Sequence, residues 1–187
     1  MPVAAALRSW LAAPQDVAAL DRLRAAAGAD AVDASAVTRL SVAAITALRT
    51  ATVPRFDGLR PCVRQAALIC GLGKALVLAF TPDEAREAEV LPFTVATIGN
   101  ELILELQPAS HSQRFGSPFL HQWAAGIQAD AMVIDCIRLN HVNSVLIAWM
   151  LQIVQSAKPV PVRIRHTKPQ VATQLKQLRL DHLMTIE

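Results

Sequence analysis

Strand-like and helix-like segments alternate through the last third of the chain, and this alternation constrains the fold more than any other feature. The β-rich runs are short and cover residues 132–137, 160–166 and 182–187. Between them stand two helix-like segments, at 144–157 and 168–180. Strands that alternate with helices in this way are typical of an α/β layer fold with at least partly parallel strands.

A β-hairpin is predicted directly before this region, at residues 93–107 with its turn at 98–101. The alternating apolar residues around the turn are Ile98, Leu102, Leu104 and Leu106. Acidic residues and two prolines interrupt the apolar pattern at 81–92, which indicates a linker between two parts of the chain.

The segments on the two sides of this linker resemble each other. A shift of 102 positions places similar residues together, namely Asp33 with Asp135, Val37 with Leu139, Leu40 with Val142, Ser41 with Asn143 and Ile45 with Ile147. A shift of 108 does the same for the tails, pairing Val63 with Val171, Ala67 with Leu175, Cys70 with Leu178 and Leu72 with Leu180. These matches predict an internal duplication, with a truncated, degenerate unit at 1–80 and a second unit at 93–187, arranged as a pseudo-dimer. The first unit lacks the hairpin and is expected to contain a helix at 17–28, ended by Gly28.

Composition excludes several classes of function. The 187 residues are 53% hydrophobic, so a substantial core is expected, and the net charge of +3 is too small to indicate nucleic-acid binding. Three cysteines in apolar surroundings, without metal or redox spacing, favour a reducing, cytoplasmic interior. The N-terminal apolar run is short and broken by Arg8 and Ser9, which argues against a signal peptide. The most apolar segments fall short of about 18 uninterrupted residues, so no membrane insertion is expected.

No group of residues in the sequence points to catalysis. Asp135, Cys136 and His141 contain the groups of a Cys–His–Asp hydrolase, but adjacent strand residues face opposite sides of a sheet, so they do not form one pocket. The five histidines contain no helical i, i+4 pair, and Gly71 and Gly73 lack Walker spacing and are expected to follow a helix. We therefore expect no catalytic residues, no cofactor and no metal.

Two other segments have structural explanations. Residues 158–168 alternate apolar residues with Arg163 and Arg165, as in a half-solvated strand. The segment 144–157 is apolar on nearly every side, so it is either buried within the chain or docks one face on another protein.

A spacing in the second unit links it to a known family. Asp135 ends a predicted strand eight residues before Asn143, which opens a helix, and the sequence LRLDHLMTI closes the unit at 178–186. In this pattern the chain resembles STAS domains, the fold of bacterial anti-sigma-factor antagonists, over residues 93–187 and more weakly over 16–80. The resemblance implies a small mixed β-sheet packed with helices in each unit.

In STAS domains the second serine of a DSSG motif accepts a phosphate from a partner kinase, and the phosphate changes the choice of partner. On this chain the motif begins at Asn143 and places Val145 at the acceptor position; in the first unit it begins at Ser41 and places Ala43 there. Neither residue has a hydroxyl group, so the resemblance implies that this switch is absent, although a shift of one residue would make Ser144 the acceptor. Asn143 and Ser41 are both expected to cap helices.

The resemblance implies a non-enzymatic module that binds a protein partner in a bacterial regulatory or assembly complex. The partner would contact residues at the two bends, namely His141, Asn143, Ser144, Val145, Ser41 and Ala43. Candidate partners are a sigma-factor regulator, a stressosome-like scaffold or a transporter ATPase. The alternatives are an accessory subunit of an ABC-type lipid transporter and a small-molecule binding module with its ligand between the two units. The oligomeric state stays open.

Overall fold

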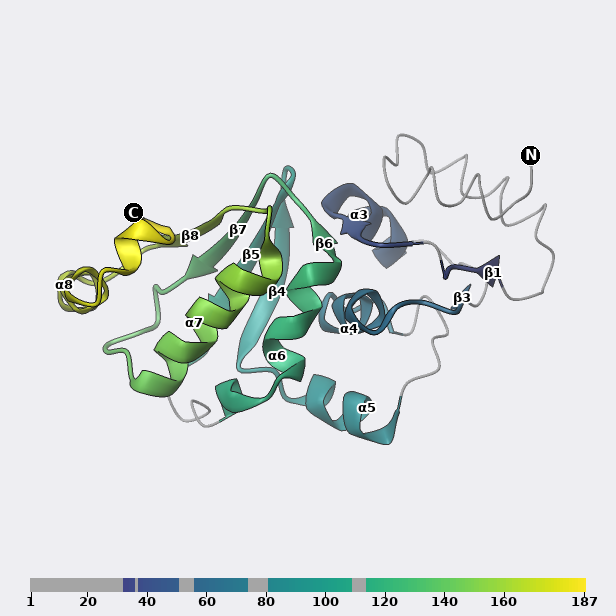
Figure 1. Ribbon diagram of the computed structural model, residues 1–187, viewed down its shortest axis with the longest axis horizontal. Coiled ribbons are helices and arrows are strands. Elements are labelled where there is room, and N and C mark those ends of the chain that lie inside the picture. The colour runs from purple at the N-terminus through teal and green to yellow at the C-terminus, as the bar shows by residue number, and fades with distance from the viewer. Residues whose placement is uncertain (1–31, 36, 51–55, 74–80, 109–113) are drawn as a thin grey trace.

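A five-stranded mixed sheet forms the centre of the computed structural model, which describes residues 32–35, 37–50, 56–73, 81–108 and 114–187 (Figure 1). The strand order is β4-β5-β7-β8-β9. The strands are β4 (Phe93–Ile98), β5 (Glu101–Leu106), β7 (Ala131–Asp135), β8 (Val162–Arg165) and β9 (Thr185–Ile186). Only β4 runs antiparallel to its neighbour, because the β4–β5 connection is a hairpin and the later connections pass through helices.

The helices of the second half connect these parallel strands. Between β5 and β7 lie α6 (Phe119–Gln122), the 3-10 helix η2 (Trp123–Gly126) and the short strand β6 (Ile127–Gln128). The later connections contain α7 (Ser144–Ala157), then α8 (Pro169–Gln177) and the 3-10 helix η3 (Leu180–His182). Figure 1 shows α6 and α7 in front of the sheet. None of the described helices is long and apolar enough to cross a bilayer.

The predicted hairpin is confirmed, but one of its predicted apolar positions is wrong. Leu102, Leu104 and Leu106 are fully buried, whereas Ile98 is 58% exposed. Ile98 pairs directly with Glu101 across the turn, so its side chain lies on the same face of the sheet as Glu101 and opposite to Leu102. The two-residue turn therefore places Ile98 on the face that α6 and α7 do not cover.

The first half adds short strands and two helices at one side of the sheet. Its elements are β1 (Val32–Asp33), β2 (Leu40–Ser41), α3 (Val42–Thr50), β3 (Phe56–Asp57) and α4 (Pro61–Ile69). β1 pairs with β3 and β2 pairs with β6, both in parallel. The predicted helix at 17–28 and the last strand expected of this unit lie outside the described residues.

Helix α3 lies beside the outer edge of β4. The Thr46 and Thr97 hydroxyl oxygens are 3.2 Å apart, and the Arg49 guanidinium donates to the Val95 carbonyl at 3.3 Å. An unpaired strand edge exposes free backbone groups that other chains can pair with, and α3 covers part of this one.

The predicted linker contains a well-capped helix, α5 (Pro82–Glu89). Thr81 and Glu84 form a capping box, in which each side chain accepts a hydrogen bond from the other residue's backbone N–H. Glu84 is buried and also accepts from Arg64 of α4 at 2.8 Å. Burial raises the pKa of Glu84, but the hydrogen bonds from Arg64 and Thr81 outweigh burial and hold it below the usual value. The division of the chain into domains at this point stays a prediction.

Several local geometries recur in the two halves at the shifts found in the sequence. In the first half the Ala34 N–H donates to the Asp57 carbonyl at 2.8 Å. The equivalent bond in the second half joins the Cys136 N–H to the Arg165 carbonyl at 3.0 Å, with the donor shifted by 102 positions and the acceptor by 108. Helices α4 and α8 are both nine residues long and both begin at proline. Left-handed residues follow the same places, namely Gly58 and His166 after β3 and β8, and Gly71 and Arg179 after α4 and α8. The pseudo-dimer arrangement stays a prediction.

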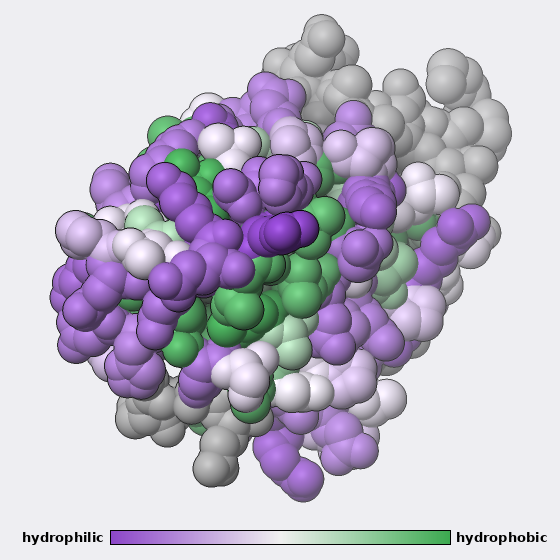
Figure 2. All heavy atoms as spheres, turned by 60° about the vertical axis from the view of Figure 1, so that its left-hand side comes forward, coloured by the Kyte–Doolittle hydropathy of each residue, from purple (hydrophilic) through white to green (hydrophobic). Residues whose placement is uncertain are grey.

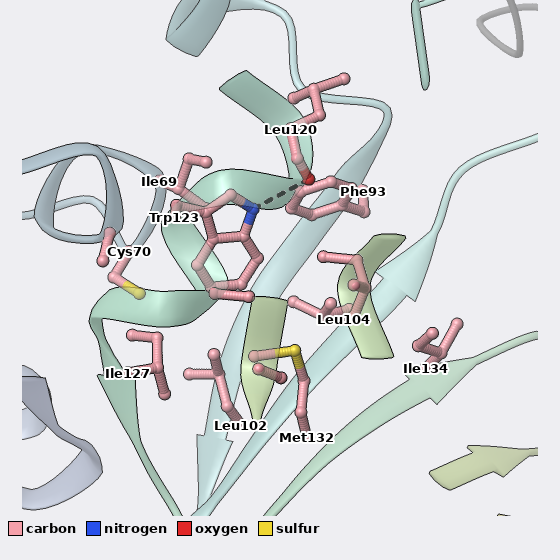
Figure 3. Close-up of a cluster of buried hydrophobic side chains, with 14 of the residues drawn as sticks. Ile69, Cys70, Phe93, Leu102, Leu104, Leu120, Trp123, Ile127, Met132 and Ile134 are labelled. Atoms are coloured by element: carbon pink, nitrogen blue, oxygen red, sulfur yellow. Dashed lines mark hydrogen bonds between the residues drawn. The ribbon is translucent and has the colours of Figure 1, made fainter. Parts of the chain in front are cut away.

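One continuous hydrophobic core includes residues from both halves. At its centre the Trp123 and Trp149 indole N–H groups both donate to the Leu120 carbonyl, at 2.9 and 2.7 Å. Figure 3 shows Ile69, the last residue of α4, and the following Cys70 beside the Trp123 ring, which faces Leu102 and Ile127 on its other sides. The two halves of the described chain therefore share one core rather than folding around two.

Candidate functional site

The bend between β7 and α7 is the candidate site. β7 ends at Asp135 and α7 begins at Ser144. The Leu139 N–H donates to the Cys136 carbonyl at 2.9 Å and makes the first turn of the bend. Asn143 stands before the helix, and its Oδ1 accepts from the Leu146 N–H at 2.9 Å, which confirms the predicted cap.

The predicted contact residues of this bend differ in their exposure. His141 and Ser144 are exposed and Asn143 is half-buried. Val145 is half-buried and packs against the core. A partner would therefore meet His141 and Ser144 first, with Val145 below them.

The corresponding bend in the first half is less open. The Ser41 hydroxyl oxygen accepts from the Ala44 N–H at 3.1 Å, as expected for the residue that precedes α3. Ser41 is buried, at 7% exposure, and Ala43 is exposed. A buried serine offers little surface to a partner, so of the two only Ala43 stays a candidate for contact.

A buried carboxylate anchors the second bend from below. Asp135 is 6% exposed, and its oxygens accept from the Ile137 N–H at 3.1 Å, the Arg165 Nε at 2.9 Å and the His166 Nδ1 at 3.1 Å. Burial raises the pKa of Asp135, but the hydrogen bonds from Ile137, Arg165 and His166 outweigh it and hold the pKa below the usual value. The carboxylate thus joins the ends of β7 and β8 to the start of the bend.

A second set of contacts ties the bend to α8. Lys168 donates to the Asn140 side chain, and the Gln170 amide donates to the Asn140 carbonyl at 2.6 Å. The Val142 N–H reaches Gln174 Oε1 at 3.5 Å. Hydrogen bonds therefore hold the bend from two sides, at Asp135 and at α8.

Arg165 and His166 were not predicted to be part of the site. Arg165 was predicted to lie on a half-solvated strand, which the alternating burial of β8 confirms. The available signal was topological: parallel neighbouring strands end at the same edge of a sheet, so the residues at the end of β8 lie beside Asp135.

The cysteines near the site are not activated nucleophiles. Cys136 is fully buried, and burial raises the pKa of its thiol to about 12, helped by the charge of Asp135. Burial likewise raises the pKa of Cys70 to about 12. Within the described ranges, no three His, Cys, Asp or Glu residues are grouped as metal ligands.

Two residues weighed in the sequence as possible ligand-binding residues, His121 and Gly71, lie in or after helices of the structure. His121 lies on α6, and burial lowers the pKa of its imidazole. Gly71 is the second residue after the end of α4 and has φ of +79°, and its N–H donates to the Leu68 carbonyl, which confirms its predicted place after a helix.

No protein-family model matches this chain, and no curated protein matches it. A solved structure of a serine-to-glutamate variant of RsbS from Moorella thermoacetica is similar, with 20% sequence identity and a TM-score of 0.43. The similar region covers 52% of this chain and 86% of the RsbS chain.

Proposed function

We propose that this chain is a non-enzymatic protein-interaction module, made of two degenerate STAS-like units, that binds a protein partner in a bacterial regulatory or assembly complex. The exposed and pre-shaped bend at 137–145 supports this proposal most directly. A partner that docks on a fixed surface does not have to order it first, which lowers the entropic cost of binding.

The duplication is part of this proposal. The recurring left-handed residues support it, because such backbone is uncommon for residues other than glycine, and His166 and Arg179 stand where the first half has Gly58 and Gly71. The equal length of α4 and α8 and the matching bonds between parallel strands add to this support. An experimental structure in which these four residues do not share the left-handed conformation would refute it.

Constitutive binding follows from the residues at the bend. Val145 and Ala43 have no hydroxyl group to accept phosphate, and Ser144 stands at the first position of α7. We therefore expect no phosphate at residues 41–45 or 143–147 after incubation with ATP and a kinase that modifies STAS proteins. Phosphopeptide mass spectrometry that finds modified Ser144 would instead indicate that the switch survives one residue earlier.

The chemistry of the bend suits an acidic or carbonyl-rich partner surface. The first turn of α7 contains no acidic residue, and the free N–H groups of a helix N-terminus give it partial positive charge. The free thiols of Cys62, Cys70 and Cys136 support a role in the cytoplasm, where cysteines stay reduced.

The test is co-purification from native cells with two variants of the full chain. Ser144→Arg and His141→Glu change exposed side chains of the bend and should remove a stoichiometric protein that the wild type retains. Ile98→Arg is the matched control, because Ile98 is also exposed but lies at the β4–β5 turn, in the row of Glu101 and Ala131, at the end of the sheet opposite to Asp135. A partner that stays bound to both bend variants, or the absence of any stoichiometric partner of the wild type, would refute the proposal.

A further inference from the structure

The helices α4 and α8 have the same length and the same backbone hydrogen bonds at their C-terminal ends, but they differ in how far the rest of the chain covers them. The side chains of Ala66 and Ile69 in α4 and of Cys70 directly after it are buried. The residues 108 positions later in and after α8 are Gln174, Gln177 and Leu178, and all three are exposed. The first half thus covers a helix face that the second half leaves open.

The element that covers α4 is helical. The 3-10 helix η2 packs so closely on α4 that a Cβ added to Gly126 would lie 2.6 Å from the Cys62 carbonyl oxygen. Figure 3 shows the Trp123 side chain of the same helix beside Ile69 and Cys70. A short helical segment with a large apolar side chain is therefore what this type of face accepts within the chain.

Residues of α7 are likewise less covered than their counterparts in α3. Ile45 of α3 is fully buried, whereas Ile147, 102 positions later in α7, is half-buried, and so is Leu151. In the first half the Arg49 side chain donates to the Cys70 carbonyl at 3.3 Å. In the second half Leu151 stands at the position of Arg49 and Leu178 at that of Cys70, so the leucine side chain cannot make this hydrogen bond. Figure 2 shows hydrophobic residues gathered over α7, with polar residues around them and over α8. We call Ile147, Leu151, Gln174, Gln177 and Leu178 the α7–α8 face.

The charge beside this face indicates the kind of partner. Residues 158–187 contain six basic residues and two acidic ones, a net charge of +4 in a chain whose total is +3. Arg163 and Arg165 are paired with acids. Lys176 and Arg179, which flank Leu178, have no acid within salt-bridge distance in the described part of the chain, and the nearest acid in sequence is the exposed Asp181.

We infer that the α7–α8 face is a second docking surface, which meets the bend where Gln174 Oε1 accepts from the Val142 N–H and continues one helical turn further to Leu178, and that it binds a helical segment of a partner protein with apolar residues on one side and acidic residues at its flank. Leu178 is 51% exposed and would be covered by the apolar side. Lys176 and Arg179 would pair with the acidic flank, which gives orientation and speeds association. Gln174 and Gln177 keep the face compatible with water when the partner is absent, so the complex is expected to be reversible.

A displayed library of random helical peptides of about 14 residues, four turns of helix, provides the probe. The immobilised full-length chain should enrich peptides that combine an apolar stripe with Asp or Glu. The affinity of one enriched peptide should fall at least tenfold in the double variant Lys176→Glu, Arg179→Asn, in which Asn tolerates the left-handed backbone at 179. Leu178→Gln should weaken binding at least threefold, and the bend variant His141→Glu should leave it within twofold.

Three results would overturn the inference. Enriched peptides could lack acidic residues, the double variant could bind as tightly as the wild type, or only vesicles with anionic phospholipid could bind while the library yields nothing. The last result would assign the basic residues to a membrane surface. Loss of binding in His141→Glu alone would place the peptide at the bend and also contradict a second surface.

Discussion

The two halves approach each other closely at Gly126, and its replacement by alanine tests whether they form one unit. The added Cβ would lie 2.6 Å from the Cys62 carbonyl oxygen, 2.8 Å from the Cys62 carbonyl carbon and 2.9 Å from the Val63 Cα. All three atoms belong to the backbone of α4, so no side chain can turn aside to make room. Relief requires α4 and η2 to move apart across a fully buried core.

The expected cost follows from these contacts. Overpacking a core costs roughly 1–3 kcal/mol even where side chains can shift, and here only backbone is available to move. Alanine also reduces the conformational freedom of the unfolded chain, which offsets the cost by about 0.5–1 kcal/mol. We expect Gly126→Ala to lower the free energy of unfolding by about 2 kcal/mol, at the upper end of this range after the offset. In a chain of this length the corresponding fall in Tm is about 4–8 °C.

Urea denaturation followed by tryptophan fluorescence measures this change, because Trp123 and Trp149 are both fully buried beside the contact. The matched control is Gly116→Ala, where an added Cβ has no atom within 4 Å. The control should unfold at the wild-type midpoint or slightly above it. A Gly126→Ala protein with the wild-type midpoint would show that η2 and α4 are not held together as described.

Three further changes test the bend and its support. Asn143→Ala removes the hydrogen bond to the Leu146 N–H and should cost about 1 kcal/mol in urea denaturation, of which Asn143→Ser should restore most. Asp135→Asn removes a carboxylate whose pKa is lowered by folding, so the stability gap between wild type and variant should be fully present at pH 7 and shrink as the pH falls below about 4; a gap that is the same at pH 3 would contradict the lowered pKa. Trp149→Phe removes one of the two indole donors to the Leu120 carbonyl while Trp123 still satisfies it, so thermal unfolding should show a loss of only about 1–2 kcal/mol.

The second half of the fold was predictable because its signals are local. The helix at 144–157 is α7, residue for residue, since an apolar pattern bounded by Asn143 and a proline after residue 157 defines both ends. The hairpin follows from alternation around a short turn. The exposure of Ile98 did not follow, because alternation shows which residues share a face only when the turn register is counted across the two strands.

The features that the sequence did not predict depend on contacts between distant segments. The pairing of β2 with β6 joins residues 40–41 to 127–128, and no local pattern indicates it. The same holds for the ion pair of Asp135 with Arg165, which requires knowledge that β7 and β8 are neighbours. Helix α5 is a different case: the sequence TPDE at 81–84 is a capping-box signal, and the acidic composition around it obscured that signal.

The shared core explains how a half without its own hairpin is stabilised. Its α4 buries Ile69 and Cys70 against Trp123 of the second half, and its α3 lies on the β4 edge that would otherwise stay open. These contacts occupy helix faces that correspond to the open face of α7 and α8. Under the proposed function, the docking surfaces among the described residues would therefore lie mainly in the second half, where Ser144 at the bend and Leu178 after α8 are exposed.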